Sequence, residues 1–345
     1  MMTNWLREPR PGAPCAIIAE IAQAHDGSLG TAHAMIDAAA DAGVDAVKFQ
    51  THIAEAESTP EEPWRVRFSP QDETRFDYWK RMEFTPEQWA GLKRHADERG
   101  LLFLSSPFSM AAVDLLRRIG VAAWKIASGE VNNVPMIRAV CADGKPVLLS
   151  SGMSGMEELG EAIGLIRSLD APVCLLQCTS SYPTPPEQAG VNMLGVFARQ
   201  FAVPVGLSDH SATIFPGIVA AWEGASVLEV HLTLSRRAFG PDVVASLTVE
   251  EMAELVRGVR YVQTMRAHPL DKDRLSVQMK AMRSTFMKSL VLRRDMKAGE
   301  AITADVLDAR KPGTGIPVSR HDAIIGRRLA RDVAALTPLQ EDDLA

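Results

Sequence analysis

The segment at residues 204–234 decides the fold. It opens with PVGLSDHSATIF (204–215) and closes with VLEVHLTL (227–234), and each stretch holds a short apolar run that ends in a histidine, His210 or His231. Runs that are apolar throughout, rather than alternating with polar residues, are typical of strands buried on both faces, as parallel strands are. The segment therefore predicts two consecutive parallel strands, each with an imidazole at its carboxyl end.

The same unit, an apolar run followed by an amphipathic helical stretch, recurs from the N-terminus up to this segment. The other runs are CAIIAEIA (15–22), DAVKFQT (45–51), LLFLSSP (101–107), AAWKIASG (122–129), PVLLSSG (146–152) and VCLLQCT (173–179). Eight strand-helix units predict an α/β protein with a (β/α)8 TIM barrel, a fold of about 250 residues.

Two regions depart from this regular alternation. Between Thr51 and Thr85 the insert HIAEAESTPEEPWRVRFSPQDETRFDYWKRMEF is long, charged and aromatic, so it is either a lid over the barrel mouth or a solvated surface excursion. After the barrel, AHPLDKDRLSVQMKAMRSTF is polar, and short β-type segments broken by Gly and Pro follow. We predict a catalytic barrel over 1–267, a linker over 268–283 and a small β-rich domain over 284–345.

The composition limits the class of protein. The 345 residues are 46% hydrophobic and 23% charged, with a net charge of -6, which argues against nucleic acid as a partner. There is no apolar signal region at the N-terminus and no run of the ~20 apolar residues that a membrane span needs, so we expect a cytoplasmic protein without membrane contact.

The four cysteines form no CxxC pair, and three of them lie in or beside apolar runs. We expect reduced thiols in the core. Cys178 lies near a strand end in LLQCTSSYPTP and has a nucleophilic role as its alternative, although no activating base is adjacent in the sequence.

Each predicted strand contributes polar residues at its carboxyl end, where TIM barrels place their active sites. These residues are Glu20, Lys48, Ser105, Ser106, Lys125, Ser128, Ser150, Ser151, Thr179 to Ser181, Ser208 to His210, and His231. Convergence of so many polar groups predicts a functional pocket.

The residue types in this pocket suggest its ligands. Two lysines among hydroxyls and glycine-flanked turns would bind a phosphate by charge and short hydrogen bonds. A Schiff-base role for Lys48 or Lys125 is the alternative. Neighbouring strands are ~4.8 Å apart, so His210 and His231 can reach one ion, and manganese or magnesium completed by water suits them better than structural zinc.

The motifs, taken in order, resemble the sialic acid synthase family, whose members make nine-carbon nonulosonic acids. They are IIAEIAQAHDGSL, AGVDAVKFQT, LSSPFS, WKIASGEVNNVP, LLSSGMS, QCTSSYPTPPE, GLSDHS, EVH and FGPD. Behind them, KSLVLRRDMKAGEAITADVLDARKPGTGI resembles the antifreeze-like (SAF) domain of these enzymes. The resemblance therefore implies a TIM barrel followed by a SAF domain.

Members of this family condense phosphoenolpyruvate with an open-chain N-acetylmannosamine-type sugar and release phosphate, using manganese or a similar divalent ion such as Mg²⁺ or Co²⁺. The resemblance implies metal binding by His210 and His231. It implies catalytic roles for Glu20, Lys48, Lys125, Glu130 and Asp242, and substrate-binding roles for Ser106, Ser128, Ser150, Ser180, Tyr182, Ser208 and Lys311. It also implies a homodimer in which the SAF domain is swapped between chains.

Four departures from the family pattern fall where the resemblance places the sugar. Asp26 and Ser180 each replace an asparagine, the usual acidic residue after His231 is missing, and Lys311 replaces an arginine. The acceptor therefore stays open between N-acetylmannosamine and a diacetamido sugar that gives legionaminic or pseudaminic acid.

Two other functions compete with this interpretation. Another phosphoenolpyruvate-dependent synthase of 3-deoxy sugar acids would need a basic cluster for a distal phosphate, and the sequence suggests none. A non-catalytic carbohydrate-binding protein would not need the lysines, serines and paired histidines at the strand ends.

Overall fold

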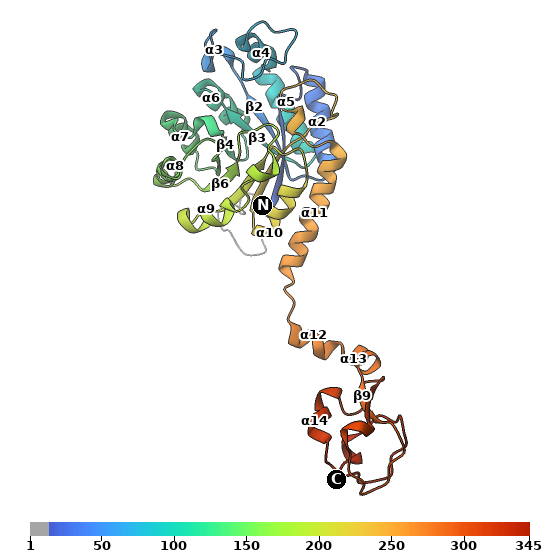
Figure 1. The fold of residues 1–345 in the computed structure, drawn as a ribbon. Coiled ribbons are helices and arrows are strands. Elements are labelled where there is room, and N and C mark those ends of the chain that lie inside the picture. The colour runs from blue at the N-terminus through green and yellow to red at the C-terminus, as the bar shows by residue number, and fades with distance from the viewer. Residues whose placement is uncertain (1–13) are drawn as a thin grey trace. The chain divides into compact units, whose positions relative to one another are not determined.

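Figure 1 shows the computed structural model of the chain, which describes residues 14–345. The chain divides into two compact units, one reaching to His268 and the other spanning Pro269–Ala345. Each unit has a hydrophobic core of its own and is described by itself. None of the helices in residues 14–345 combines the length and the apolar character that crossing a lipid bilayer requires.

The first unit is a closed barrel of eight parallel strands in sequence order, which confirms the predicted fold class (Figure 1). The strands are β1 (Ala16–Ala22), β2 (Ala46–Thr51), β3 (Leu102–Pro107), β4 (Trp124–Ile126), β5 (Val147–Ser150), β6 (Val173–Cys178), β7 (Val205–Asp209) and β8 (Val227–His231). Nearly all of their residues are buried, because helices cover the outer face and side chains fill the interior.

Helices surround the barrel and begin at residues that favour helix starts. They are α2 (Leu29–Ala42), α5 (Pro86–Glu98), α6 (Met110–Ile119), α7 (Val134–Cys141), α8 (Met156–Ser168), α9 (Met193–Phe201), α10 (Phe215–Glu223) and α11 (Val249–Ala267). Thr85 and Thr248 form capping boxes at the starts of α5 and α11. Gly43 ends α2 in the left-handed conformation that glycine adopts at low cost.

The strand register puts polar and apolar residues at different depths of the barrel. At the carboxyl ends, Glu20 of β1 lies opposite Lys48 of β2 on one side and opposite His231 of β8 on the other. Deeper inside, the barrel is filled by a layer that includes Ile18, Leu104, Leu148, Leu176 and Val227. The apolar layer supports the fold, and the polar ends remain available for chemistry.

The insert after β2 folds over its own small core. It contains α3 (Ala54–Glu57) and α4 (Arg75–Met82), and a capping box at Thr74 starts α4. Its cluster comprises the buried Ala54, Tyr78, Trp79 and Met82, with Trp64, Phe68 and Phe76 packed against them. The insert is therefore a folded part of the first unit.

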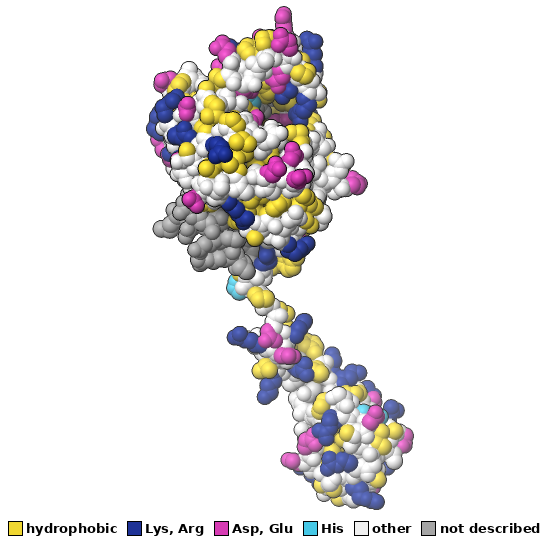
Figure 2. All heavy atoms as spheres, turned by 90° about the vertical axis from the view of Figure 1, so that its left-hand side faces the viewer, with side chains coloured by type: hydrophobic (Ala, Val, Ile, Leu, Met, Phe, Trp, Pro, Cys, Tyr) yellow, Lys and Arg dark blue, Asp and Glu magenta, His cyan; other side chains and the backbone are white. Residues whose placement is uncertain are grey.

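The second unit is a small, mostly irregular domain with an antiparallel pair, β9 (Ser289–Leu292) and β10 (Leu307–Arg310). Its helices are α12 (Lys272–Gln278), α13 (Lys280–Phe286) and α14 (His321–Ile324). The segment 268–283, predicted as a linker, therefore contains helical turns. Leu290, Leu292, Ile302 and Leu339 form part of the core, and lysine and arginine side chains spread over the face seen in Figure 2.

Candidate active site

A cavity of about 390 Å³ lies at the carboxyl ends of the barrel strands. Most of the site residues predicted from the sequence line it: Glu20, Lys48, Ser106, Lys125, Ser128, Ser150, Ser180, Tyr182, Ser208, His210, His231 and Asp242. Residues from eight different strands and their following loops thus meet at one place, because parallel strands of a barrel all end on the same side.

The floor of the cavity is a chain of alternating charges. Lys48 Nζ forms an ion pair with Glu20 and lies 3.8 Å from Glu229 Oε1, while Lys125 Nζ lies 3.5 Å from the same Glu229 oxygen. All four side chains are almost fully buried, so each charge depends on its neighbours for stabilisation. Glu20 Oε1 and Glu229 Oε2 have no hydrogen-bond partner within residues 14–345, which leaves acceptors for a bound molecule or water.

Sequence analysis did not single out Glu229. It lies two residues before His231 on β8, and residues two apart on a strand face the same side, so the pair faces the barrel interior together. That spacing in VLEVH was the available signal. Burial raises the pKa of Glu20, whereas Lys125 and Lys48 outweigh burial and lower the pKa of Glu229. The two carboxyl groups therefore differ in their tendency to hold a proton.

The serines hold the lysines in place. Lys125 Nζ donates to Ser150 Oγ at 2.7 Å, Lys48 Nζ donates to Ser106 Oγ at 3.3 Å, and Ser208 Oγ donates to Glu229 at 3.0 Å. Burial alone would lower the pKa of Lys48, but Glu20 and Glu229 raise it. A charged ammonium suits anion binding rather than the neutral amine that an imine requires.

The cysteines behave as the sequence predicted. All four are free and buried. Cys178 lines the cavity and accepts a hydrogen bond from Ser128 Oγ at 3.7 Å. Burial raises the pKa of its thiol, which opposes a nucleophilic role.

His210 and His231 lie side by side, with ring centroids 5.2 Å apart. His210 Nδ1 is 2.9 Å from the carbonyl oxygen of Thr179, which can only accept, so Nδ1 carries the proton and Nε2 keeps its lone pair. Burial lowers the pKa of His210 to about 4 and that of His231 to about 3, so both rings are neutral near pH 7.

Two neutral imidazoles fit a divalent metal ion, because the lone pair of a neutral ring is the ligand. Within residues 14–345 no third His, Cys, Asp or Glu joins the pair as a metal-ligating cluster. Water or substrate oxygens would therefore complete the coordination of an ion held by His210 and His231.

Tyr182 lines the cavity beside the histidine pair. Its ring stacks on His210 with centroids 4.2 Å apart, and its hydroxyl is 3.2 Å from His210 Nε2. Arg65 of the insert lies over the Tyr182 ring, with Cζ 4.4 Å from the ring centroid. Its NH2 is 3.2 Å from Asp242 Oδ1. Arg65 was not predicted, since nothing in WRVRF identifies which arginine turns toward the barrel.

The insert forms the outer wall of the cavity. Trp64, Arg65, Phe68, Tyr78 and Trp79 all line it. This placement agrees with the predicted cover at the barrel mouth and disagrees with the alternative, a solvated surface excursion.

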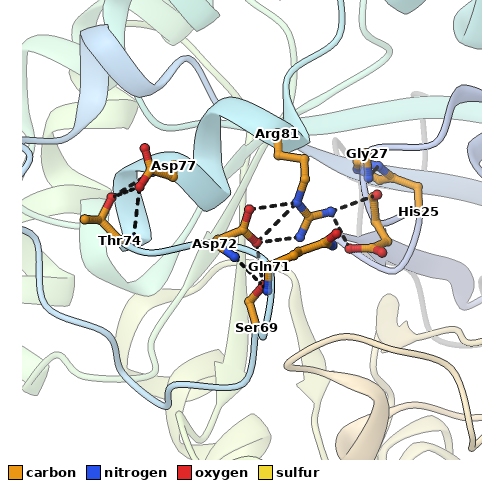
Figure 3. A network of polar contacts seen from close by, with 9 residues as sticks. His25, Gly27, Ser69, Gln71, Asp72, Thr74, Asp77 and Arg81 are labelled. Atoms are coloured by element: carbon orange, nitrogen blue, oxygen red, sulfur yellow. Dashed lines mark hydrogen bonds and ion pairs between the residues drawn. The ribbon is translucent and has the colours of Figure 1, made fainter.

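An ion-pair network fastens the insert to the β1–α2 loop (Figure 3). Arg81 of α4 holds Asp72 through two nitrogens, with NH2 2.7 Å from Oδ2, and contacts Asp26 Oδ1 through NH1 at 2.6 Å. The loop approaches α4 closely, because a Cβ at Gly27 would lie 2.4 Å from the Arg81 carbonyl oxygen. Asp26 does not line the cavity. This departure from the family pattern, expected where the sugar binds, therefore lies instead at the contact with Arg81 of the insert.

Five of the strand-end residues listed for the predicted pocket do not line the cavity: Ser105, Ser151, Thr179, Ser181 and Asp209. Of the residues to which the family resemblance gives a role, two lie outside the lining. Glu130 is in the turn after β4, where its carboxylate accepts from Asn133 Nδ2 at 2.6 Å. Lys311 is exposed in the second unit, with Nζ 5.3 Å from the Phe286 ring centroid. Their roles stay predictions.

Comparisons with known proteins agree with this geometry. The NeuB family profile matches residues 35–269, and the SAF domain profile matches residues 288–345. The chain is 33% identical over 344 residues to an N,N'-diacetyllegionaminic acid synthase of Legionella pneumophila, covering 97% of this chain and 96% of the relative.

Two further proteins extend the likeness. The chain is 33% identical over 336 residues to the N-acetylneuraminate-9-phosphate synthase of Homo sapiens, covering 96% of this chain and 91% of that one. A crystal structure of an N-acetylneuraminic acid synthetase from Leptospira borgpetersenii matches with a TM-score of 0.69 and 29% identity, covering 78% and 92% of the two chains. With both domain profiles in sequence order, the chain belongs to the NeuB family of nonulosonic acid synthases and carries a C-terminal SAF domain.

Proposed function

We propose that the chain condenses phosphoenolpyruvate with an open-chain, N-acetylated amino sugar and releases inorganic phosphate. The observation that carries this proposal is the position of two buried lysines and two neutral histidines around one cavity. The product would be a nonulosonic acid of the neuraminate, legionaminate or pseudaminate type.

Phosphoenolpyruvate would lie on the floor of the cavity. Lys48 and Lys125 provide two buried positive charges, and Ser106 and Ser150 hold their ammonium groups. An ester that carries both a carboxylate and a phosphate would form charge-assisted hydrogen bonds there, in a water-poor site where such bonds are strong. Ser128 and Ser208 line the same region, and their hydroxyls would donate to the ligand in place of Cys178 and Glu229.

His210 and His231 would hold the divalent ion, for which we expect Mn²⁺, with Mg²⁺ and Co²⁺ as the alternatives. When bound, the ion would act as a Lewis acid on the aldehyde of the acceptor. The His210–Thr179 hydrogen bond would fix the tautomer and the ring orientation, as outer partners of metal-binding histidines do.

The reaction forms one carbon–carbon bond and exchanges one carbon–oxygen bond for another. The methylene carbon of phosphoenolpyruvate attacks the aldehyde carbon, water adds to the carbon that carries the phosphate, and phosphate leaves from that carbon as the ketone forms. Of the two protons of that water, one goes to the former aldehyde oxygen and the other to the departing phosphate. Glu20, at the floor next to Lys48, would carry such a proton. Tyr182 and Asp242 line the part of the cavity that the sugar would occupy, which we call the sugar side.

The test is phosphate release on mixing the protein with phosphoenolpyruvate, Mn²⁺ and single acceptors. The panel contains N-acetylmannosamine, a 2,4-diacetamido-2,4,6-trideoxyhexose and arabinose 5-phosphate, and the product is identified by mass. Release that depends on an N-acetylated acceptor supports the proposal. Release with the phosphorylated pentose instead would indicate a 3-deoxy sugar acid synthase, and sugar binding without release would indicate a carbohydrate-binding protein.

We also propose that the protein works as a homodimer and that Lys311 of one chain reaches the sugar of a second copy. The basis is the family resemblance, with Lys311 exposed on its loop in the SAF unit. Mixed dimers of His210→Ala chains and chains cut after residue 283 should regain part of the activity that each lacks alone. No recovery in proven heterodimers would contradict the proposal.

A further inference from the structure

We propose that Arg65 binds the acceptor sugar directly and that the insert segment Trp64–Phe68 selects an uncharged acceptor. This inference rests on the proposed function and assigns to the insert a specificity that the barrel strands do not supply. We call the segment Trp64–Phe68 the arm.

The position of Arg65 supports a binding role. Its side chain is 46% exposed, it lines the cavity, and it holds only one hydrogen bond to a side chain, from NH2 to Asp242 Oδ1 at 3.2 Å. A guanidinium has five N–H donors in a fixed plane. Within residues 14–345 the other donors of Arg65 have no hydrogen-bond partner, so they can reach a hydroxyl or an amide oxygen of a ligand.

Arg65 also connects the sugar side to the histidine pair. Its guanidinium lies over the Tyr182 ring at 4.4 Å, and the Tyr182 hydroxyl is 3.2 Å from His210 Nε2. A sugar that extends outward from the histidines must pass the Tyr182 and Asp242 side chains, both of which Arg65 contacts. Arg65 is therefore at the first point where the insert can touch the acceptor.

The rest of the arm is apolar. Trp64 and Phe68 line the cavity and meet at right angles with ring centroids 5.6 Å apart, and Phe68 packs on Tyr78 at 5.0 Å. Aromatic faces suit the C–H surface of a sugar and the methyl groups of acetamido or deoxy positions. An anionic substituent at this wall would lose hydration without an apolar gain.

The cations at this wall are already compensated. Arg65 lies 3.2 Å from Asp242, and Arg75, the other arginine that lines the cavity, lies 3.2 Å from Glu62. Arg65 and Arg75 are 46% and 27% exposed, so water screens their attraction for a phosphate far more than it screens that of the buried floor lysines, and the paired carboxylates repel the phosphate. The geometry thus favours an acceptor whose far end carries amides, hydroxyls or methyl groups.

The experiment measures KM and kcat for the acceptor and for phosphoenolpyruvate in wild type, Arg65→Ala and Arg65→Lys. Lys80→Ala is the matched control, because Lys80 lies in the same insert, is 45% exposed, also has one ion pair, to Glu55, and does not line the cavity. Melting curves of all four proteins check that the fold is intact.

We expect Arg65→Ala to raise the acceptor KM by about tenfold to a hundredfold, the loss of a charge-assisted hydrogen bond, with the phosphoenolpyruvate KM within twofold of wild type. Arg65→Lys should retain part of the affinity, since it keeps the charge but not the planar fork. An unchanged acceptor KM, or equal rises in both KM values, would overturn the role of Arg65.

The selectivity is tested by comparing kcat/KM for N-acetylmannosamine, the diacetamido-trideoxyhexose and N-acetylmannosamine 6-phosphate. Preference for either uncharged sugar supports the inference, and preference for the phosphorylated one overturns it. If wild type releases no phosphate with any acceptor, the proposed function fails on its own. Calorimetric binding of the same sugars to wild type and Arg65→Ala then still decides whether Arg65 binds them.

Discussion

The floor and the outer wall of the cavity are built in different ways. The floor comes from the carboxyl ends of β1, β2, β4 and β8, which fix Glu20, Lys48, Lys125 and Glu229 in an almost fully buried charge chain. The wall comes from one insert, whose key side chain, Arg65, is half exposed and held by a single ion pair. Under the proposed function, the scaffold would fix the groups that perform the chemistry, and the insert would supply the contacts that select the acceptor.

This difference predicts that damage to the floor abolishes catalysis while damage to the wall changes acceptor affinity. The largest effect is expected for Lys125→Met, which removes a buried positive charge and leaves Ser150 and Glu229 without it. We expect kcat/KM for phosphoenolpyruvate to fall by about 10² to 10³ or more, as on loss of a preorganised charge stabiliser. Phosphate release measures it, with the surface variant Lys145→Met as control. Activity within tenfold of wild type would refute the role of the charged floor.

The next effect concerns the histidine pair. His231→Ala removes one of the two neutral imidazoles, and we expect Mn²⁺ to bind at least about tenfold to a hundredfold more weakly, the loss seen even for outer-shell substitutions. Calorimetry with Mn²⁺ measures this without relying on turnover. His268→Ala, an exposed histidine at the end of α11, is the control. If both variants bound Mn²⁺ with equal affinity, His210 and His231 would not be the metal site.

A smaller effect is expected where the wall is fastened. Asp72→Asn weakens the two-nitrogen contact with Arg81, although Asn can still accept one hydrogen bond. We expect the acceptor KM to rise several-fold, the phosphoenolpyruvate KM to stay constant, and hydrogen exchange to quicken in residues 64–82. A rise in both KM values would mean that the insert also supports the floor.

The same contact carries a pH dependence. The Arg81 hydrogen bonds lower the pKa of Asp72 below its ordinary value. A carboxyl group with a depressed pKa in the folded state stabilises that state at neutral pH, and this contribution is lost as the pH falls through the depressed value. The protection factors of the insert amides, which compare each exchange rate with the intrinsic rate at the same pH, should therefore fall in acid in wild type and change less in Asp72→Asn.

The floor and the wall also differ in how much of their structure could be predicted from the sequence. The barrel followed from apolar runs that repeat eight times, and its floor followed from strand-end residues such as Lys48 and His231, because strand register fixes what meets at a barrel end. Glu229 was within reach by the same period-two argument. The insert offered no such periodicity: the pairing of Arg81 with both Asp26 and Asp72 depends on how a loop packs, and short-range sequence cannot specify that.

The smallest effect on the acceptor KM is expected for Asp26→Asn, at the contact between the β1–α2 loop and the insert. The backbone of Asp26 is left-handed, with φ of 49°, a conformation that Asp and Asn both tolerate, so Asp26→Asn should leave the loop in place. The amide oxygen can still accept from Arg81 NH1, and the side chain is 36% exposed, so water screens the lost charge. Such pairs are worth about 0–1 kcal/mol, and we expect less than a twofold change in the acceptor KM.

Asp72 is only 6% exposed, which is why its variant should have the larger effect. If Asp26→Asn instead matched or exceeded Asp72→Asn, the β1–α2 loop, not the contact within the insert, would be what holds the wall against the barrel.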